Sequence, residues 1–392
     1  MKCHLAIGTL VAASSLAIGC PVAAAAENGW ELPVLSVPAA QAISKGDGIT
    51  VAVIDTGIRT EHPALAGRAT EGPDFLGATG QNSQPWYGAH GTSMASSVLD
   101  VAPGAKVLGL RALRDSDDPS FQTWEQSMEH GSLSGQGDPI GKAIRYATDH
   151  GARVVSLSLG SQVSLGAYSD ETMQAVQYAL GKGVVVIASG GNDGDGDNHL
   201  AYPVGYPGVI GVAATNPDGS RAEFSSVHDY VDVAAPGVGI NEADTSTNGR
   251  TPADGTSCSG ALTAGVAALI LAEYPELAPR QVEQLLQSTA STYGQGHNPL
   301  TGYGVINAEA ALRAAASLRP ESPALAVGKE GAGVHFGPGD DGTPRIINYG
   351  MNSEDLVIGG VAGALGLLLV GVGWLLFRRG RRAQRQWMAN VR

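Results

Sequence analysis

The sequence predicts a doubly wound α/β domain, in which a mostly parallel β-sheet carries helices on both faces. Its short apolar runs are continuous rather than alternating, which is typical of strands that are buried on both faces of a parallel sheet. Between these runs come segments with helical spacing that end at glycine. Strands and helices in alternation imply right-handed crossovers and a doubly wound sheet. The apolar runs are residues 49–54, 106–110, 152–157, 184–188 and 209–214.

Two segments between the runs show the helical pattern most clearly. Residues 139–147 place Ile140, Ile144 and Ala147 at helical spacing, and residues 171–180 repeat the pattern. In doubly wound folds the active site lies at the carboxyl ends of the strands. Polar residues that follow the apolar runs are therefore the first candidates for chemistry.

Composition supports a globular protein and argues against one class of partner. The chain has 392 residues, of which 43% are hydrophobic and 16% charged. Lys2 and six arginines beyond residue 377 leave the central part with 17 basic residues against 37 acidic ones. An acidic body without a basic patch argues against nucleic-acid binding, and its charge is explained by solubility.

The N-terminal residues 1–26 read as a signal peptide. Lys2 supplies a short positive region, an apolar stretch follows, and alanines at 23–26 form a small-residue cleavage site. Cys20 offers an alternative, a lipid-modified N-terminus, but the residues before it lack the leucine usual three positions upstream. After cleavage the chain would keep Cys258 as its one thiol, without an internal disulfide.

A C-terminal transmembrane helix is predicted at residues 356–377. These 22 residues carry no charge and would span about 33 Å as a helix, enough for a hydrocarbon core of ~30 Å. Two acidic residues precede the segment and an arginine-rich tail, residues 378–392, follows it. The positive-inside rule then places the tail in the cytoplasm and the rest outside, as in a single-pass cell-membrane protein. A buried core helix is the alternative, although nothing follows that could cover it.

The remaining boundaries follow from composition. The stretch 317–355 is rich in Gly, Pro, Asp and Ser and reads as a linker to the membrane. The folded domain is then residues 48–316. Residues 27–47 form a short N-terminal extension that we expect to pack against it.

Three polar residues in glycine-rich contexts form the main catalytic hypothesis. Asp55 ends the first strand, His90 precedes a helical stretch at 93–99, and Ser257 precedes another at 261–272. Each has a structural explanation when taken singly: a turn cap, a buried histidine and a helix N-cap. A serine at a helix N-terminus also lies where free N–H groups favour developing negative charge. The order Asp, His, Ser makes the combination specific.

These motifs resemble those of the subtilase family of serine peptidases over nearly the whole predicted domain. The three active-site motifs of that family are matched by Asp55-Thr-Gly, His90-Gly-Thr and Gly255-Thr-Ser257. Three further segments also fit, namely residues 156–160, 188–194 and 224–237. The resemblance implies a subtilisin-like fold and an endopeptidase that acts on exported or surface polypeptides, without cofactor or metal.

The resemblance also implies a role for each matched residue. Ser257 would attack the scissile carbonyl, His90 would transfer the proton, and Asp55 would orient His90. Asn192 would donate to the oxyanion together with the Ser257 N–H. Ser158, Leu159 and Gly160 would pair with an extended substrate.

Other motifs of the sequence compete with these assignments. Ser93, in Gly91-Thr-Ser-Met-Ala, also resembles a nucleophile motif, but it stands only three residues after His90, so Ser257 is preferred. The alternating aspartates from Asp193 suggest a calcium loop. Asn198 and Val204 occupy the positions where an EF-hand has glycine and glutamate, so a polar loop is preferred. His62, in Glu-His-Pro, is interpreted as structural.

A narrower resemblance is to the mycosins, the subtilases of type VII secretion. A short N-terminal extension, a subtilase domain and a C-terminal membrane helix occur together in both. The usual mycosin disulfides cannot form here, and Cys258-Ser-Gly-Ala replaces the family's Met-Ala-x-Pro after the serine. The resemblance implies association with a type VII secretion complex. It also leaves a second hypothesis, a structural subunit of such a complex in which proteolysis is dispensable.

Overall fold

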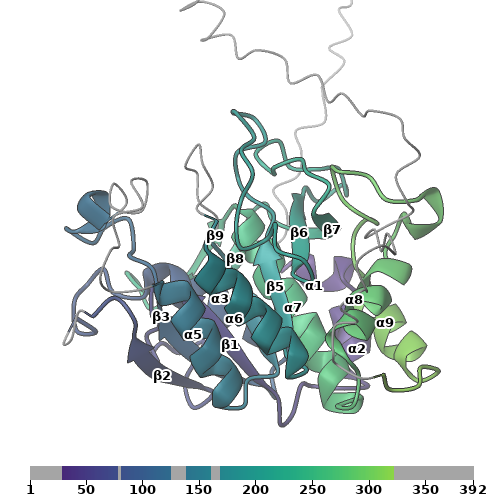
Figure 1. The fold of residues 1–392 in the computed structure, drawn as a ribbon, viewed down its shortest axis with the longest axis horizontal. Coiled ribbons are helices and arrows are strands. Elements are labelled where there is room, and N and C mark those ends of the chain that lie inside the picture. The colour runs from purple at the N-terminus through teal and green to yellow at the C-terminus, as the bar shows by residue number, and fades with distance from the viewer. Residues whose placement is uncertain (1–28, 78–80, 125–137, 160–167, 322–392) are drawn as a thin grey trace, which may run out of the picture.

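A seven-stranded parallel sheet forms the centre of the computed structural model (Figure 1). The strand order is β2-β3-β1-β4-β5-β6-β7, so the chain builds outward from β1 in both directions. This reversal at β1 and β4 is the topological switch point, where doubly wound folds bind ligands. The structure describes residues 29–77, 81–124, 138–159 and 168–321. The predicted signal peptide, membrane helix and tail and most of the linker lie outside these residues.

The strands match the five predicted apolar runs and add two that were not predicted. Edge strand β2 has the polar sequence Ala-Thr-Glu-Gly-Pro-Asp and is partly exposed, so it lacks the apolar signal. Edge strand β7 lies within the subtilase-like segment 224–237, for which the sequence analysis predicts no strand. The strands are β1 Thr50–Asp55, β2 Ala69–Asp74, β3 Lys106–Arg111, β4 Val154–Leu157, β5 Val185–Ser189, β6 Ile210–Thr215 and β7 Val231–Pro236.

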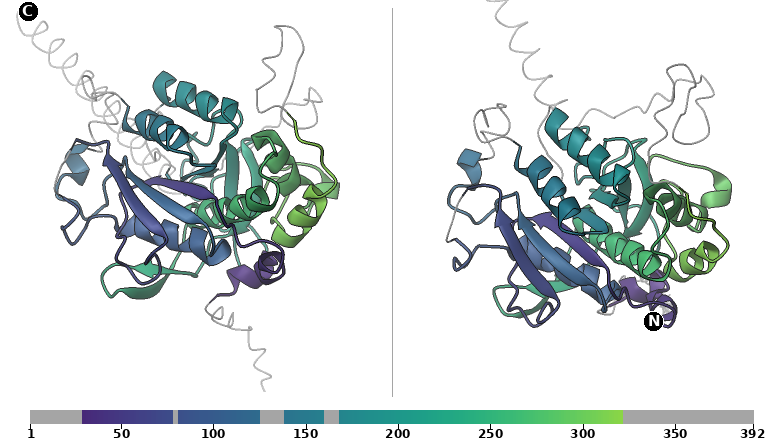
Figure 2. Two further views of the ribbon diagram at one scale, coloured as in Figure 1. Left: turned by 90° about the horizontal axis from the view of Figure 1, so that it is seen from below. Right: turned by 60° about the horizontal axis from the view of Figure 1, so that its bottom comes forward.

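Helices cover both faces of the sheet, which confirms the predicted fold class (Figure 2). Alternate residues of β1 point to opposite cores: Val51 and Val53 join one cluster, whereas Ala52 and Ile54 join the other. One face carries α5 (Pro139–Asp149) and α6 (Asp170–Gly181). The other carries α1 (Glu31–Val34), α2 (Val37–Gln41), α3 (Ala89–Val101), α7 (Thr256–Glu273), α8 (Pro279–Ser288) and α9 (Ala308–Ala315).

Two helices begin earlier than the sequence predicted. Helix α3 starts at Ala89 and α7 at Thr256, so His90 and Ser257 lie in the first turn of their helices rather than ahead of them. Their glycine-rich contexts hid these starts, because glycine is a weak helix former in sequence patterns. The smaller remaining elements are the antiparallel hairpin β8 (Ile240–Asp244) and β9 (Gly249–Ala253) and the 3₁₀ helix Tyr293–Gln295.

Helix α7 lies at the centre of one layer. It is the one helix within the described ranges that is long and apolar enough to cross a membrane, with a mean hydropathy of 1.4. Yet 83% of it is buried inside the domain, against strands β4 to β7 and helix α3. Its apolar character therefore reflects its place in the core.

The residues that precede β1 pack against this same layer. The backbone N–H of Ala308 donates to Leu35 O (2.9 Å), and the Ser44 hydroxyl donates to Leu269 O (2.8 Å). Trp30 Nε1 donates to Val238 O (3.2 Å). These contacts join the extension to α9, to α7 and to the turn before β8.

The contact between α3 and α7 predicts a stability difference between two glycine variants. A Cβ on Gly265 would lie 2.6 Å from Val101 Cβ and 3.0 Å from Val98 O, whereas a Cβ on Gly181 would meet nothing within 4 Å. Gly265→Ala should therefore lower the free energy of unfolding by about 1–3 kcal/mol through overpacking. Gly181→Ala, the matched control, should not. Thermal unfolding measures both, and equal midpoints would contradict the close packing.

Candidate active site

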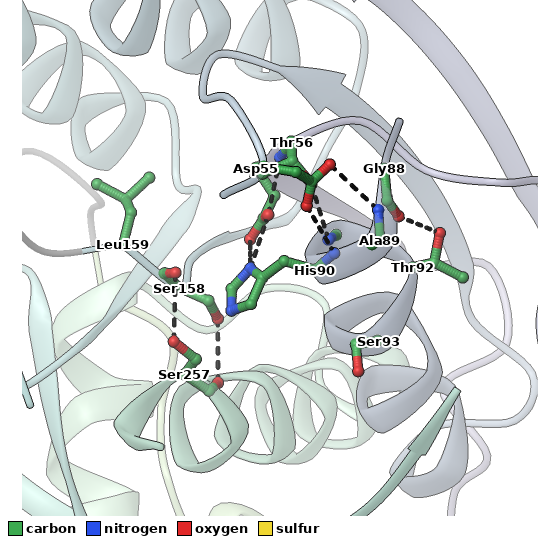
Figure 3. Close-up of polar contacts among 12 residues, drawn as sticks. Asp55, Thr56, Gly88, Ala89, His90, Thr92, Ser93, Ser158, Leu159 and Ser257 are labelled. Atoms are coloured by element: carbon green, nitrogen blue, oxygen red, sulfur yellow. Dashed lines mark hydrogen bonds and ion pairs between the residues drawn. The ribbon is translucent and has the colours of Figure 1, made fainter. Parts of the chain in front are cut away.

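A carboxylate–imidazole pair lies at the carboxyl end of β1 (Figure 3). Asp55 is fully buried, and its Oδ1 accepts a hydrogen bond from Thr56 N (2.7 Å). His90 Nδ1 lies 2.8 Å from Oδ1 and 3.0 Å from Oδ2 of the same carboxylate. Because an ionised carboxylate only accepts, Nδ1 carries the proton in this pair. The neutral imidazole therefore has its lone pair on Nε2, the nitrogen away from Asp55.

Close backbone packing sets the position of His90. A Cβ on Gly91 would lie 2.0 Å from Gly57 O, so only glycine lets α3 approach the segment after β1 this closely. The Gly91 N–H donates to Thr56 Oγ1 (3.1 Å). The first turn of α3 is thus anchored to the end of β1, and His90 is carried against Asp55.

A second carboxylate caps the start of α3. Asp115 accepts from the backbone N–H of Ala89 (3.2 Å) and of His90 (3.0 Å). This contact satisfies two of the free N–H groups at the helix start and places negative charge there, where it is favourable. Burial raises the pKa of Asp115; the His90 N–H bond opposes this rise and the charge of Asp55 adds to it.

Burial and the Asp55 carboxylate act in opposite directions on the pKa of His90. Burial alone would lower the pKa of the imidazole, but the charge and hydrogen bond of Asp55 outweigh it. Smaller contributions come from Glu242 and Asp115, and the pKa of His90 rises to about 9. The His90 side chain is still 40% exposed, so a substrate can reach the ring.

Ser257 stands in the first turn of α7, opposite His90 (Figure 3). In the part of the chain that the structure describes, its hydroxyl donates to Ser158 O (3.4 Å) rather than to His90. Ser158 Oγ donates in return to Ser257 O (3.0 Å). Hydrogen bonds of catalytic groups are often long without substrate and shorten in the complex. Figure 3 shows the His90 ring bonded to Asp55, with Ser257 on the neighbouring helix.

Asn192 is held in one orientation beside the start of α7. Its Oδ1 accepts from Thr256 N (2.9 Å) and Thr256 Oγ1 (2.8 Å), which leaves the Nδ2 amide group free to donate. A Cβ on Gly255 would lie 3.6 Å from Asn192 Nδ2 and 3.7 Å from Ser257 N. Because Gly255 has no side chain, the space next to these two donors stays open. Two donors beside one small space are what an oxyanion site needs.

The predicted substrate strand is described only in part. Ser158 and Leu159 follow β4 and are buried, and Ser189 Oγ donates to Leu159 O (3.3 Å). Gly160 lies outside the described residues. The two described residues come directly from the strand beside β1, so they border the same switch point as Asp55.

The competing motifs lie away from this arrangement. Ser93 Oγ donates to Glu242 Oε2 (2.8 Å), and Figure 3 shows its side chain apart from the pair. His62 is buried, with Nε2 near Asp244 O and Nδ1 accepting from Ala64 N, which agrees with a structural role.

The aspartate-rich loop is held by its own side chains. Asp193 Oδ2 pairs with His199 Nδ1 (2.8 Å), and the Asn198 amide bonds to both backbone groups of Val227. Within the described ranges no group of three or more acidic, histidine or cysteine side chains is placed to hold a metal ion.

Four residues around the pair were not predicted as site residues. Thr56 and Thr256 lie inside the quoted motifs, so their position next to Asp55 and Ser257 could have indicated them. Asp115 follows the end of β3, where polar residues are candidates in this kind of fold. Glu242 carried no usable signal, since the hairpin that holds it had not been predicted.

Comparison with known proteins identifies the family. The model of the subtilase family, peptidase S8, matches residues 46–305. The chain belongs to the subtilase family. It is accordingly a serine endopeptidase of the subtilisin type.

Its relatives include subtilisins and a protease from a secretion system. The subtilase is 35% identical to subtilisin DY of Bacillus licheniformis over 72% of its own length and 98% of that protein. It is 36% identical to fervidolysin of Fervidobacterium pennivorans over 69% of its length, but spans only 41% of fervidolysin. The solved structure of the MycP3 protease from the type VII (ESX-3) secretion system aligns with a TM-score of 0.62 at 27% identity. That alignment covers 74% of the subtilase and 90% of MycP3, in line with the mycosin-like resemblance.

The Asp55–His90 contact predicts how His90 titrates. The pKa of His90 should lie above the ordinary 6.5, near 9. It should fall in Asp55→Asn, because the substitution removes the negative charge that raises this pKa against the lowering effect of burial. By linkage, the stability that this pair contributes is full below pH 6.5 and is lost as the pH rises to about 9. NMR titration of labelled histidines measures the pKa, with His90→Gln to assign the signal. Identical curves for wild type and Asp55→Asn would contradict the contact.

Proposed function

We propose that this subtilase is anchored in the cell membrane and cleaves exported or surface polypeptides outside the cell. The observation that carries the proposal is the Asp55–His90 pair, in which the buried carboxylate is bonded to a partly exposed imidazole, near Ser257 in the first turn of α7. No cofactor or metal takes part in the proposed chemistry.

The proposed reaction is an acyl transfer in two stages. Ser257 Oγ attacks the scissile carbonyl carbon while His90 Nε2 accepts its proton. His90 then gives this proton to the leaving amine, and the acyl group stays on Ser257 until water, activated by the same histidine, releases it. Asp55 stabilises the imidazolium form in both stages. Because only the neutral imidazole accepts a proton, kcat/KM should rise with pH through the titration of His90.

The oxyanion of each tetrahedral intermediate would lie next to Gly255. There the Asn192 Nδ2 group and the Ser257 N–H can both donate to it. Both donors are held before substrate arrives, Asn192 through Thr256 and Ser257 through α7, so little reorganisation is needed during the reaction. Ser158 and Leu159, at the end of β4, would pair with the backbone of an extended substrate.

The wider setting proposed is a type VII secretion complex. The similar MycP3 protease comes from such a system, and residues 356–377 have the length and composition of a membrane span. The structural-subunit hypothesis shares this setting but does not require catalysis by Ser257. A secretion phenotype that survives Ser257→Ala would favour the structural role, whereas a phenotype lost in that variant requires catalysis.

Labelling with a fluorophosphonate tests the nucleophile. The wild-type chain should be labelled on Ser257, and Ser257→Ala should lose the label completely. Ser93→Ala should still carry the label on Ser257, because the Ser93 hydroxyl is directed to Glu242. Label on Ser93, or a folded wild type that takes no label, would contradict the proposed site.

Substitution of Asn192 tests the oxyanion site. Asn192→Asp keeps an oxygen for Thr256 but removes the donor, and Asn192→Ala removes both. Each should lower kcat by about 10²–10³ with little change in KM, the loss seen when one such donor is removed in subtilisin, itself a subtilase. Steady-state kinetics on a peptide substrate measure this loss. A wild-type kcat for Asn192→Asp would show that the amide does not contact the oxyanion.

A further inference from the structure

A buried carboxylate is bonded to α3, the helix that carries His90. Glu242, in strand β8, is only 1% exposed. Its Oε2 accepts from Ser93 Oγ (2.8 Å) and its Oε1 from Ser97 Oγ (2.9 Å). The buried Cys258 thiol interacts with the same carboxylate. Burying a carboxylate is costly unless it is paired or hydrogen-bonded, so the two hydroxyl donors support a retained anion.

The side chains that interact with Glu242 include residues of both helices that carry the proposed reacting groups. Ser93 lies three residues after His90 on α3, and Cys258 directly follows Ser257 on α7. Glu242 therefore connects α3 to α7 within one residue of Ser257 and one helical turn of His90. Cys258 stands where the family usually has methionine, whose thioether has no hydrogen to donate.

The hairpin that carries Glu242 is itself held on α3. The Ala243 N–H donates to Ser96 Oγ (2.9 Å). On the neighbouring strand, both terminal nitrogens of Arg250 lie 2.6 Å from the oxygens of Asp100. With two separate attachments beside it, Glu242 has little freedom to move relative to α3.

Glu242 also acts on the charge of His90. The titratable groups that interact with it are His90 on α3, Cys258 on α7, Glu31 on α1 and Arg250 on β9. Burial raises the pKa of Glu242, while its bonds with Ser93, Cys258 and Ser97 and the nearby His90 lower it. The charge of Glu242 raises the pKa of His90, and burial raises that of Cys258.

We propose that Glu242 is a positioning residue of the active site. Its carboxylate holds the helices of His90 and Ser257 in register and places a second negative charge near the imidazole, in addition to that of Asp55. The charge stabilises the imidazolium that forms when Ser257 loses its proton. The effect of Glu242 on catalysis rests on the proposed function. The contacts of Glu242 with Ser93 and Ser97 do not depend on it.

The charge is tested by the titration of His90 in the full-length chain. Glu242→Gln keeps the size of the side chain and removes its charge, so the pKa of His90 should fall relative to wild type. Glu242→Asp keeps the charge and should restore the pKa toward the wild-type value. Glu283→Gln, the same change at a half-buried glutamate that is not among the groups acting on His90, should leave it where it is. A His90 pKa in Glu242→Gln equal to that of wild type overturns the proposal.

The positioning effect is tested at a pH above the titration of His90, where the imidazole is neutral in every variant. There the rate of fluorophosphonate labelling of Ser257 should fall about 10- to 100-fold in Glu242→Gln, the size of loss that small misplacement of reacting groups causes. A plateau rate unchanged from wild type overturns the proposal. If the wild type itself takes no label, the proposed function fails, while the histidine titration still decides the role of the Glu242 charge.

Discussion

The contact between Asp55 and His90 is the constraint on which the site depends. A carboxylate buried at the end of a central strand is stable only with donors around it, and here the donors are Thr56 N and the His90 ring. The ring must therefore come to the carboxylate, which requires α3 to begin against the segment after β1. The absence of a side chain at Gly91 makes that approach possible.

The second reacting helix is positioned by a different means. Helix α7 is apolar along its whole length and is packed on all sides, so its place is set by burial rather than by polar contacts. Burial alone would not fix the position of the first turn of α7 relative to α3. Hydrogen bonds fix this position, because Thr256 is bonded to Asn192 and Ser257 is bonded to Ser158. The backbone at Thr256 and Ser257 is therefore held by contacts to two other segments of the chain.

Negative charge surrounds His90 from three elements. Asp55 on β1, Asp115 after β3 and Glu242 on β8 each raise the pKa of the imidazole, while burial lowers it. The balance favours the protonated ring, which is the form that develops as the serine is deprotonated. The raised pKa makes the His90 imidazole a stronger base. A smaller fraction of molecules then carries the neutral imidazole at neutral pH.

The sequence by itself determined the fold class and the candidate residues, because both are written in local patterns. Buried parallel strands are continuous apolar runs, and Asp55, His90, Asn192 and Ser257 stand in short motifs with glycines around them. Only the tertiary structure decided how these residues are held. Glu242 and Ser93 are 149 positions apart in the chain, and Asp115 and His90 are 25 apart, so no local pattern relates them. The pKa of His90 likewise depends on charges and burial that three distant segments create together, which exist only once the chain has folded.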